Sequence, residues 1–261
     1  LAHLAFNHFV LNVPYYREMY RLSDHKMSLS RMTLVNWLAK GAAFTSALIE
    51  RLKDRAMVKD SIVNCDETWC KVKMNRHFLK KYVWCLVNKE QKIAIYCYED
   101  GSRGRKVLKG ILKDRQVKAL QSDGYNVYMY IDKELVDTEH LCCLAHARAK
   151  FVLPPTHPPR GELMDKAVNY LQVFWKQLFA YLNDGRYDID NSIAERFIRP
   201  LAGGRKNSLF FVGSRMANVS AAYHTLLSTC RMNGLSALEY LKKFFHEIVK
   251  GRKIIIISPL A

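Results

Sequence analysis

Three acidic residues that lie far apart in the sequence occupy positions from which they could hold metal ions together. Asp66 ends the apolar segment SIVNCDE, and Asp123 ends the segment VKALQSDG. Glu195 heads a basic region, because no further Asp or Glu occurs before Glu239. Carboxylates that converge repel one another and raise each other's pKa, and hard cations such as Mg²⁺ relieve that repulsion. Two Mg²⁺ ions roughly 4 Å apart, or Mn²⁺ in their place, can activate a hydroxyl and stabilise the leaving oxygen in a displacement at phosphorus.

Each of these acids also has a simpler explanation. Glu195 could pair with Arg199, four residues further along an exposed helix. Asp123 and Gly124 form a dipeptide that is common in turns, and Asp66 could cap the turn that follows it. Spacing alone does not decide between these explanations. The strands and helices that carry the acids determine whether the carboxylates converge.

The balance of charge indicates a polyanionic partner. The chain of 261 residues has 41 Lys and Arg against 24 Asp and Glu, which gives a net charge of +17. Such an excess favours nucleic acid, although a basic protein with no such role stays the alternative. The region behind Glu195 supplies the cations that we expect to bind phosphates: Arg196, Arg199, Arg205, Lys206 and Arg215.

The elements around the first two acids predict a mixed sheet. The segments SIVNCDE, HFLKKYVWCLVN and KIAIYCYED read as three antiparallel strands, followed by a helix in GRKVLKGILKD. VKALQSDG is a fourth strand, and HLCCLAHARAKF is a fifth strand that enters a helix. This order is typical of a ribonuclease-H-like α/β core, a mixed five-stranded sheet with flanking helices. In that order the first and fourth strands are neighbours, so Asp66 and Asp123 would converge at the strand ends.

Glu195 is predicted to lie on a helix over 191–199. Asp190 and Asn191 are plausible N-caps of this helix. Apolar residues recur every four positions and would place it on the sheet: Ile189, Ile193 and Phe197. Glu195 projects about 160° from Phe197 around the helix, so periodicity does not place it beside the other acids.

Helices are predicted on both sides of the core, and the expected division of the chain follows from them. Ser30 is a possible N-cap for a helix through Ala43, preceded by a helical stretch near 14–22. The pair is either a helix-turn-helix with Arg31 and Lys40 facing DNA, or a helical hairpin packed on the core. The predicted parts are N-terminal helices in 1–60, the catalytic core in 61–213 with an extended, proline-rich linker at 152–161, C-terminal helices in 214–250 and a tail at 251–261.

The seven cysteines are scattered and form no CxxC pair, which is typical of buried thiols in a reducing cytosol. No apolar run is long enough to span a bilayer. We therefore expect a cytoplasmic protein without a membrane partner.

The residues around the acids resemble the DDE transposases of the insertion-sequence 66 type. CDETWCKV resembles the block of the first aspartate, LQSDGYNVY that of the second, and CLAHARAKF the segment that follows. The longest match is the glutamate block, YLNDGRYDIDNSIAERFIRPLAGGRKNSLFFVGS, and SLSRMTLVNW resembles the family's helical segment before the first aspartate. The likeness covers roughly residues 10–248 in the order of the family.

This resemblance implies a Mg²⁺-dependent DNA transposase in which Asp66, Asp123 and Glu195 are the metal ligands. Such enzymes hydrolyse a DNA strand at the element end and use the freed 3′-hydroxyl to attack target DNA. The implied partners are double-stranded DNA, both element ends and target, a second copy of the chain assembled on DNA, and accessory proteins of the same element. The implied location is the bacterial cytoplasm, at the nucleoid when the protein is bound to DNA.

Cys143 and His146 match a Cys-x-x-His signature of the family. With His140 and Cys142 nearby, zinc binding is conceivable, but loosely spaced ligands are a weak zinc signal. We expect instead a structural cysteine and a histidine near the active site.

The sequence also departs from the family. Members usually have a longer helical insertion after HARAKF and an N-terminal extension with cysteine pairs, and the ending GRKIIIISPLA is unlike theirs. We expect a truncated copy with impaired activity on this basis. The alternatives are a non-enzymatic DNA-binding remnant of a transposase, or a stand-alone nuclease of the ribonuclease-H class.

Overall fold

The computed structural model describes residues 1–113, 115–135, 137–152 and 160–251 of the chain. Most of the predicted linker at 152–161 and of the tail at 251–261 lies outside these residues. Among the described residues no helix has both the length and the apolar composition that crossing a bilayer requires.

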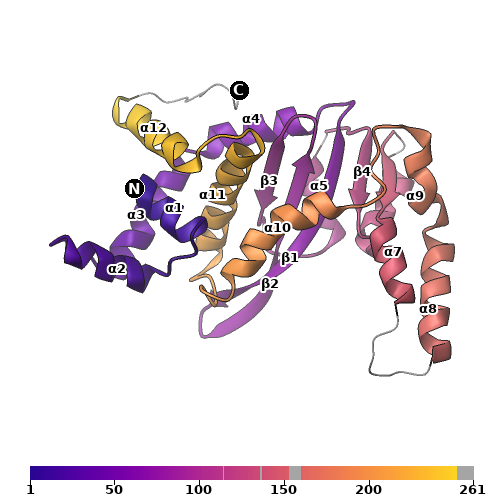
Figure 1. Ribbon diagram of the computed structural model, residues 1–261, viewed down its shortest axis with the longest axis horizontal. Coiled ribbons are helices and arrows are strands. Elements are labelled where there is room, and N and C mark those ends of the chain that lie inside the picture. Colours follow the sequence, from indigo (N-terminus) through magenta and orange to yellow (C-terminus); the bar gives the residue numbers. More distant parts are fainter. Residues whose placement is uncertain (114, 136, 153–159, 252–261) are drawn as a thin grey trace.

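A mixed sheet forms the centre of the molecule (Figure 1). Its strands follow the order β3-β2-β1-β4-β5. Antiparallel pairs join β1 to β2 and β2 to β3, and parallel pairs join β1 to β4 and β4 to β5. The strands are β1 Ile62–Met74, β2 His77–Asn88, β3 Ile93–Cys97, β4 Ala119–Ser122 and β5 Glu139–Cys142. The antiparallel meander and the neighbouring first and fourth strands are therefore confirmed.

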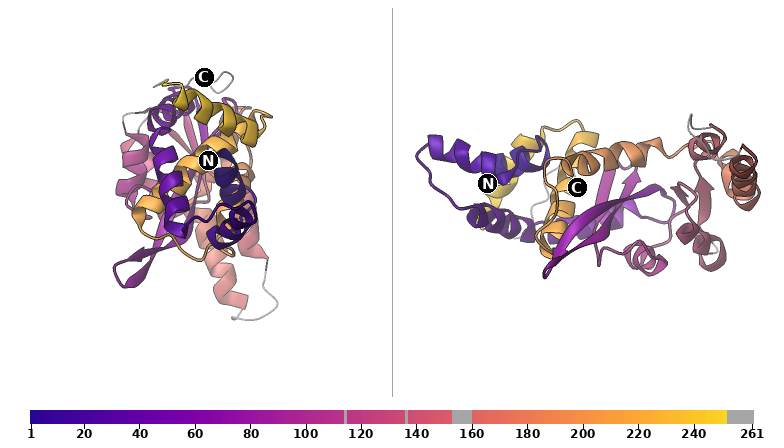
Figure 2. Two further views of the ribbon diagram at one scale, coloured as in Figure 1. Left: turned by 90° about the vertical axis from the view of Figure 1, so that its left-hand side faces the viewer. Right: turned by 90° about the horizontal axis from the view of Figure 1, so that it is seen from below.

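Helices cover the sheet and extend beyond it at both ends. They are α1 Ala2–Phe9, α2 Tyr15–Asp24, α3 Arg31–Ala43, α4 Ser46–Ala56, α5 Arg105–Leu112, α6 Ile131–Glu134, α7 Leu144–Phe151, α8 Arg160–Val173, α9 Trp175–Phe179, α10 Ser192–Gly204, α11 Ser214–Met232 and α12 Ala237–Val249, with 3₁₀ turns η1 Asn126–Tyr130 and η2 Ala180–Asn183. Figures 1 and 2 show α1–α3 and α12 at one end of the sheet and α7–α9 at the other.

Two apolar layers hold the sheet between its helices. Alternate residues along a strand point to opposite faces, and consecutive residues are buried along β3 and the second half of β2, so both faces are covered there. One layer packs α4, α5 and η1 on the sheet and contains Leu52, Trp84, Ile95, Leu108 and Tyr128. The other packs α10 and α11 on the opposite face and contains Val72, Cys85, Tyr96, Ile198 and Ala221. All seven cysteines are free and buried, as expected of small apolar side chains.

The predicted helices are present, but several boundaries differ. Helix α10 continues through Pro200 to Gly204, past its predicted end at residue 199. Arg160 and Gly161 belong to α8, whereas the sequence predicts an extended linker through residue 161. Pro159 is the last proline of this segment, so no proline prevents the chain from entering a helix directly after it. The helical region that starts with α8 is divided into α8, α9 and η2.

The helices before the core form a packed annex. The Ser30 hydroxyl accepts a hydrogen bond from Thr33 N at 3.1 Å, which confirms the predicted N-cap of α3. Leu34 and Leu38 of α3 are fully buried, and the Tyr223 hydroxyl of α11 donates to Leu38 O at 3.1 Å. The α2–α3 pair is thus packed on the rest of the chain, and DNA contact through its exposed residues Arg31 and Lys40 stays a prediction.

Helix α11 also protects the outer edge of the sheet. The backbone N–H groups of β3 that face away from β2 donate to threonine hydroxyls of α11. Tyr96 N donates to Thr225 Oγ1 at 2.9 Å, and Ala94 N donates to Thr229 Oγ1 at 3.2 Å. An open edge strand invites pairing with another chain, and these two bonds remove that edge.

Replacing Thr225 by Val should therefore destabilise the protein although the two side chains have nearly the same shape. Thr225 is fully buried, and the substitution leaves Tyr96 N–H without an acceptor. We expect the free energy of unfolding to fall by about 1–3 kcal/mol in urea denaturation. Ser46→Ala, which removes an exposed hydroxyl bonded to Ala43 O, is the control and should change it by less than about 0.5 kcal/mol. Equal effects of the two substitutions would contradict this account of the edge.

Candidate active site

Asp66 and Asp123 lie at the same level of two neighbouring parallel strands. The register pairs Ile62 with Ala119 and Asn64 with Gln121. Asp66 stands two residues beyond Asn64, and Asp123 stands two residues beyond Gln121. The two carboxylates are close enough for the charge of Asp123 to raise the pKa of Asp66. The fold thus brings the two acids to one level, as predicted. Only Asp123 follows the end of its strand, however, because β1 continues past Asp66 to Met74 in its hairpin with β2.

The turn after β4 fixes the backbone of Asp123. Its Oδ1 accepts a hydrogen bond from Tyr125 N at 3.1 Å, and its carbonyl accepts one from the Tyr170 hydroxyl of α8 at 2.8 Å. Gly124 has a φ of 76°, in the left-handed region, and a Cβ there would collide with the Tyr170 hydroxyl. Glycine is required at this position for both reasons.

Asn191 anchors the start of α10 to β1. Its Nδ2 donates to Cys65 O at 2.8 Å, and its Oδ1 accepts from Asn64 Nδ2 at 3.0 Å. Asn64 Nδ2 also donates to Gln121 Oε1 at 2.8 Å, which ties in β4. All three amides are almost fully buried. The sequence predicts Asn191 as a helix cap, but its side chain makes no cap bond and is used instead to join α10 to the sheet. Asp190 Oδ1 accepts from Ser192 N at the start of the helix.

Arg205 anchors the other end of α10 to the same strand. Its Nη1 donates to Thr68 Oγ1 at 2.7 Å and to Trp69 O. Its guanidinium lies 4.3 Å from the centre of the Trp69 ring, a cation–π contact. Helix α10 thus lies along β1 between two fixed points, and its apolar residues Ile198 and Leu201 are buried against the sheet.

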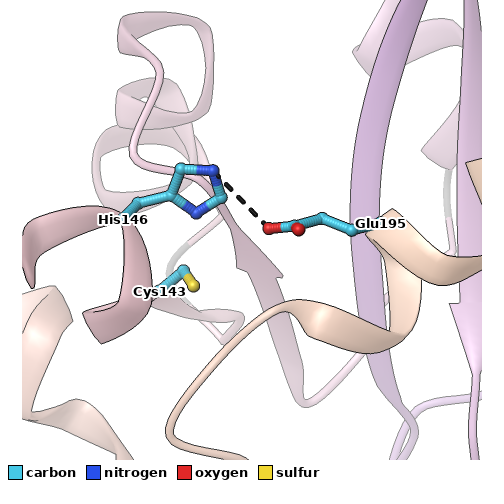
Figure 3. Close-up of side chains that lie close together, drawn as sticks. All are labelled: Cys143, His146 and Glu195. Carbon is cyan, nitrogen blue, oxygen red and sulfur yellow. Dashed lines mark ion pairs between the residues drawn. The ribbon is translucent and has the colours of Figure 1, made fainter. Parts of the chain in front are cut away.

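Glu195 lies between these two anchors, on the side of α10 that faces Asp66. Its charge is the smallest of the causes that raise the pKa of Asp66, which places Glu195 within electrostatic range of that acid. Its carboxylate lies 3.6 Å from His146 Nε2 on α7, and the side chain is 35% exposed. Figure 3 shows His146 and Cys143 facing Glu195 from the opposite helix. Within the described residues Glu195 forms its ion pair with His146, and no ion pair with Arg199 is present.

Burial, together with nearby carboxylates, raises the pKa of Asp66 to about 7. Burial is the main cause, followed by the charge of Glu67 and the charges of Asp123 and Glu195. A hydrogen bond from Glu67 N to Asp66 Oδ1 opposes the shift. A carboxyl group held this way has reason to bind a cation, because a cation removes both the repulsion and the desolvation penalty.

Glu67 belongs to the site although the sequence gave no reason to select it. As the next residue on β1 it points to the opposite face, where its fully buried carboxylate pairs with Arg103 at 2.5 Å. The Tyr128 hydroxyl donates to its other oxygen at 2.9 Å, and Arg103 stacks 3.8 Å from the Tyr125 ring. Burial raises the pKa of Glu67, and the Arg103 partner opposes the rise. The alternation of side chains along a strand is the sequence signal that could have assigned Glu67 and Asp66 to opposite faces of β1.

A groove of about 740 Å³ opens beside Asp123 and runs between α7 and α8. Asp123, His146, Lys150, Lys166 and Tyr170 line it. Lys150 is four residues after His146 on α7 and therefore lies on the same side of the helix, with its Nζ 4.9 Å from the Tyr170 ring centre. The groove combines an acid of the cluster with two lysines, a pattern that the sequence analysis missed.

The predicted phosphate-binding residues differ in their surroundings. Arg196, Arg199, Lys206 and Arg215 are exposed on α10, on the loop after it and on α11. Arg199 is one turn beyond Glu195 and lies on the same side of α10. Arg205 is held by β1, so it has a structural role whatever else it binds.

Cys143 and His146 lie where a histidine near the active site is expected. The Cys143 sulfur and, behind it, the carboxylates of Glu195 and Asp123 raise the pKa of His146 to about 9, against the effect of burial. The function of either residue stays a prediction.

Fold and site define a mixed α/β protein with acidic residues at one level of two neighbouring parallel strands and exposed basic residues on α10 and after it. The family model described as the Transposase IS66 family matches residues 1–154 and 152–218. The chain belongs to this family.

Three proteins of Sinorhizobium fredii (strain NBRC 101917 / NGR234) are similar to parts of the chain. Uncharacterized protein y4qI is 40% identical over 33% of this chain and 16% of its own length. Uncharacterized protein y4jD is 21% identical over 96% of this chain and 62% of its own length. Uncharacterized protein y4hP is 34% identical over 31% of this chain and 15% of its own length. The chain thus spans less than two thirds of the length of these relatives.

Asp66→Asn should stabilise the metal-free protein, and more so at alkaline pH. The folded pKa of about 7 exceeds the ordinary value of 3.8, so the folded state binds more protons and loses stability as pH rises through this window. Removing the charge should raise the free energy of unfolding by about 2 kcal/mol at pH 8 and hardly at all at pH 4, with allowance for screening. Chemical denaturation with a chelator present measures both values.

Asp60→Asn is the matched control for this prediction. Hydrogen bonding and charge from Arg186 lower the pKa of this exposed carboxyl group, so its charge stabilises the folded state above the ordinary pKa. The substitution should therefore have the opposite sign at pH 8. A loss of stability in Asp66→Asn at pH 8 would show that the acids do not repel one another.

Proposed function

We propose that this protein is a DNA transposase that cleaves and joins DNA strands with a metal-dependent DDE triad of Asp66, Asp123 and Glu195. We infer that its sheet and flanking helices are a ribonuclease-H-like core. The strand order β3-β2-β1-β4-β5, with β1 and β4 parallel, supports this inference. Membership of the family supports the reaction class, because transposition requires a phosphoryl transfer on DNA.

The observation that carries the proposal is the convergence of three acids from three separate elements. The parallel register of β1 and β4 places Asp66 and Asp123 at the same level. Glu195 joins them because Asn191 and Arg205 hold its helix along β1. Burial first, and then the charges of Glu67, Asp123 and Glu195, raise the pKa of Asp66 to about 7, and a strongly shifted carboxyl group of this kind is typical of a functional site.

The donor set fits a hard divalent cation. Asp66, Asp123 and Glu195 offer carboxylate oxygens, which Mg²⁺ and Mn²⁺ prefer. When bound, such ions make an attacking hydroxyl more nucleophilic and stabilise the oxygen that leaves phosphorus. We propose two ions, by analogy with other two-metal phosphoryl-transfer sites.

The remaining residues of the site position the DNA. Arg199, one turn beyond Glu195 on α10, and Lys150, which lines the groove beside Asp123, would bind phosphates near the scissile bond. In the first step, water attacks phosphorus and the bond to the 3′-oxygen breaks, which leaves a 3′-hydroxyl. In the second, this hydroxyl attacks a phosphate of target DNA and displaces another 3′-oxygen. We also propose assembly of several copies on DNA, and help from accessory proteins of the element.

Loss of any one acid should abolish strand cleavage. The assay uses the purified chain, Mg²⁺ or Mn²⁺, and duplex DNA carrying the sequences that flank its gene. Asp66→Asn, Asp123→Asn and Glu195→Gln should each reduce cleavage by about a thousandfold or more, and a double variant should be no worse, because the acids act as one unit. DNA binding without metal should survive or tighten, since a negative charge is removed.

Two acids outside the site provide the controls for this assay. Asp190→Asn affects the start of α10, and Glu162→Gln affects an exposed pair with Lys166 on α8. Both variants should cleave within about threefold of the parent at equal folded concentration. A Glu195→Gln variant as active as the parent would refute the triad. Binding without cleavage in the parent would favour a DNA-binding remnant, and cleavage without joining would favour a nuclease.

DNA affinity should depend steeply on salt, through the exposed cations beside the acids. Each phosphate contact releases counterions, so Arg199→Gln and Lys206→Gln should each flatten the plot of log affinity against log salt by about one unit. Lys243→Gln removes the same charge from an exposed position on α12 and is the matched control. An equal change in all three variants would mean that only net charge matters and that DNA does not lie over α10.

A further inference from the structure

Cys143, His146 and Glu195 form a cluster of mixed metal-ligand types beside the acidic cluster. One ligand atom from each lies within 4.8 Å of the others. Cys143 and His146 belong to the start of α7, and Glu195 faces them from α10 (Figure 3). The N-terminal ends of α7 and α10 therefore bring together a sulfur, an imidazole nitrogen and a carboxylate oxygen.

The local structure prepares Cys143 to act as a ligand. It is the N-cap residue of α7, where unpaired N–H groups favour negative charge. Asn191 N donates a hydrogen bond to its Sγ at 3.2 Å, a bond that stabilises a thiolate. His146 is three residues further on, so the first turn of α7 presents both side chains on one side.

The imidazole of His146 has a ring nitrogen without a hydrogen-bond partner. Its Nδ1 is buried and unpaired among the described residues, while Nε2 lies 3.6 Å from the Glu195 carboxylate. Figure 3 shows Nδ1 turned to the side of Cys143. An unpaired buried nitrogen is costly and indicates a group that a ligand completes.

We propose that Cys143, His146 and Glu195 bind a thiophilic divalent cation of the Zn²⁺ class. A set of sulfur, nitrogen and one oxygen suits Zn²⁺ and is unsuited to Mg²⁺, which requires oxygen ligands. Three protein ligands leave a fourth position for water or a phosphate oxygen. Binding releases the proton of the Cys143 thiol and any proton on the coordinating imidazole nitrogen to solvent.

This site is distinct from the proposed Mg²⁺ site, but it shares Glu195 with it. A cation held by the sulfur would draw Glu195 away from Asp66 and Asp123. The two sites would then compete for one carboxylate, a consequence that rests on the proposed function. The binding itself does not rest on it.

Cobalt binding tests the proposal. Co²⁺ alone is titrated into the metal-free full chain, and the absorption spectrum reports a sulfur–cobalt charge-transfer band and the strong visible bands of tetrahedral cobalt. We expect both, at one equivalent, and displacement by Zn²⁺ but not by a large excess of Mg²⁺. No sulfur–cobalt band in the parent protein would overturn the proposal.

Variants identify the ligands. Cys143→Ser should remove the charge-transfer band, and His146→Gln and Glu195→Gln should each weaken Co²⁺ binding by at least about tenfold. Cys142→Ser, at the neighbouring buried cysteine, and Asp66→Asn, at the neighbouring acid, should retain the band. A band that survives Cys143→Ser, or that disappears in Cys142→Ser, would overturn the assignment.

Two features keep the test decisive. If Cys143→Ser does not fold, Glu195→Gln provides the answer, because Glu195 is 35% exposed and its substitution is tolerated more easily. Unchanged Co²⁺ affinity in a folded Glu195→Gln variant would overturn the proposal. DNA cleavage plays no part in this measurement, so a negative result leaves the proposed transposase activity standing, and an inactive chain leaves the cation site standing.

Discussion

The hydrogen bonds of Asn191 to β1 are the interaction on which the site depends. One buried amide donates to Cys65 O and accepts from Asn64, and Asn64 in turn bonds Gln121 on β4. Buried amides with any bond missing are costly, so the network permits one arrangement of helix and strands and opposes others. The network also fixes the position of Glu195, because Glu195 lies one helical turn after Asn191.

The sheet and this network place like charges together, and the rest of the site offsets the repulsion. Burial and neighbouring carboxylates raise the pKa of Asp66 to about 7. On the other face of β1, Glu67 is compensated by Arg103 and Tyr128 instead of being left with the other acids. On the far side of the cluster, His146 faces Glu195. The site thus costs folding stability, which a bound cation would recover under the proposed function.

Much of the fold could be predicted because its signals are local. Strand alternation, the β1–β2–β3 meander and the helix cap at Ser30 each depend on residues close in sequence. The pairing of the first and fourth strands followed from the order of elements, and it brought Asp66 and Asp123 to one level. The start of α8 was placed too late because helix boundaries after prolines carry a weak local signal.

The sequence by itself determined the strands, most of the helices, the charge and the three acids as candidates, because residue type and periodicity encode them. Only the tertiary structure decided that Glu195 turns to the acids, since helical periodicity left that side of α10 open. It also decided that Asn191 binds β1, that Arg205 holds the end of α10, and that Lys150 lines the groove. The partners in these contacts lie mostly far apart in the chain. Local sequence patterns therefore do not reveal that these residues become neighbours when the chain folds.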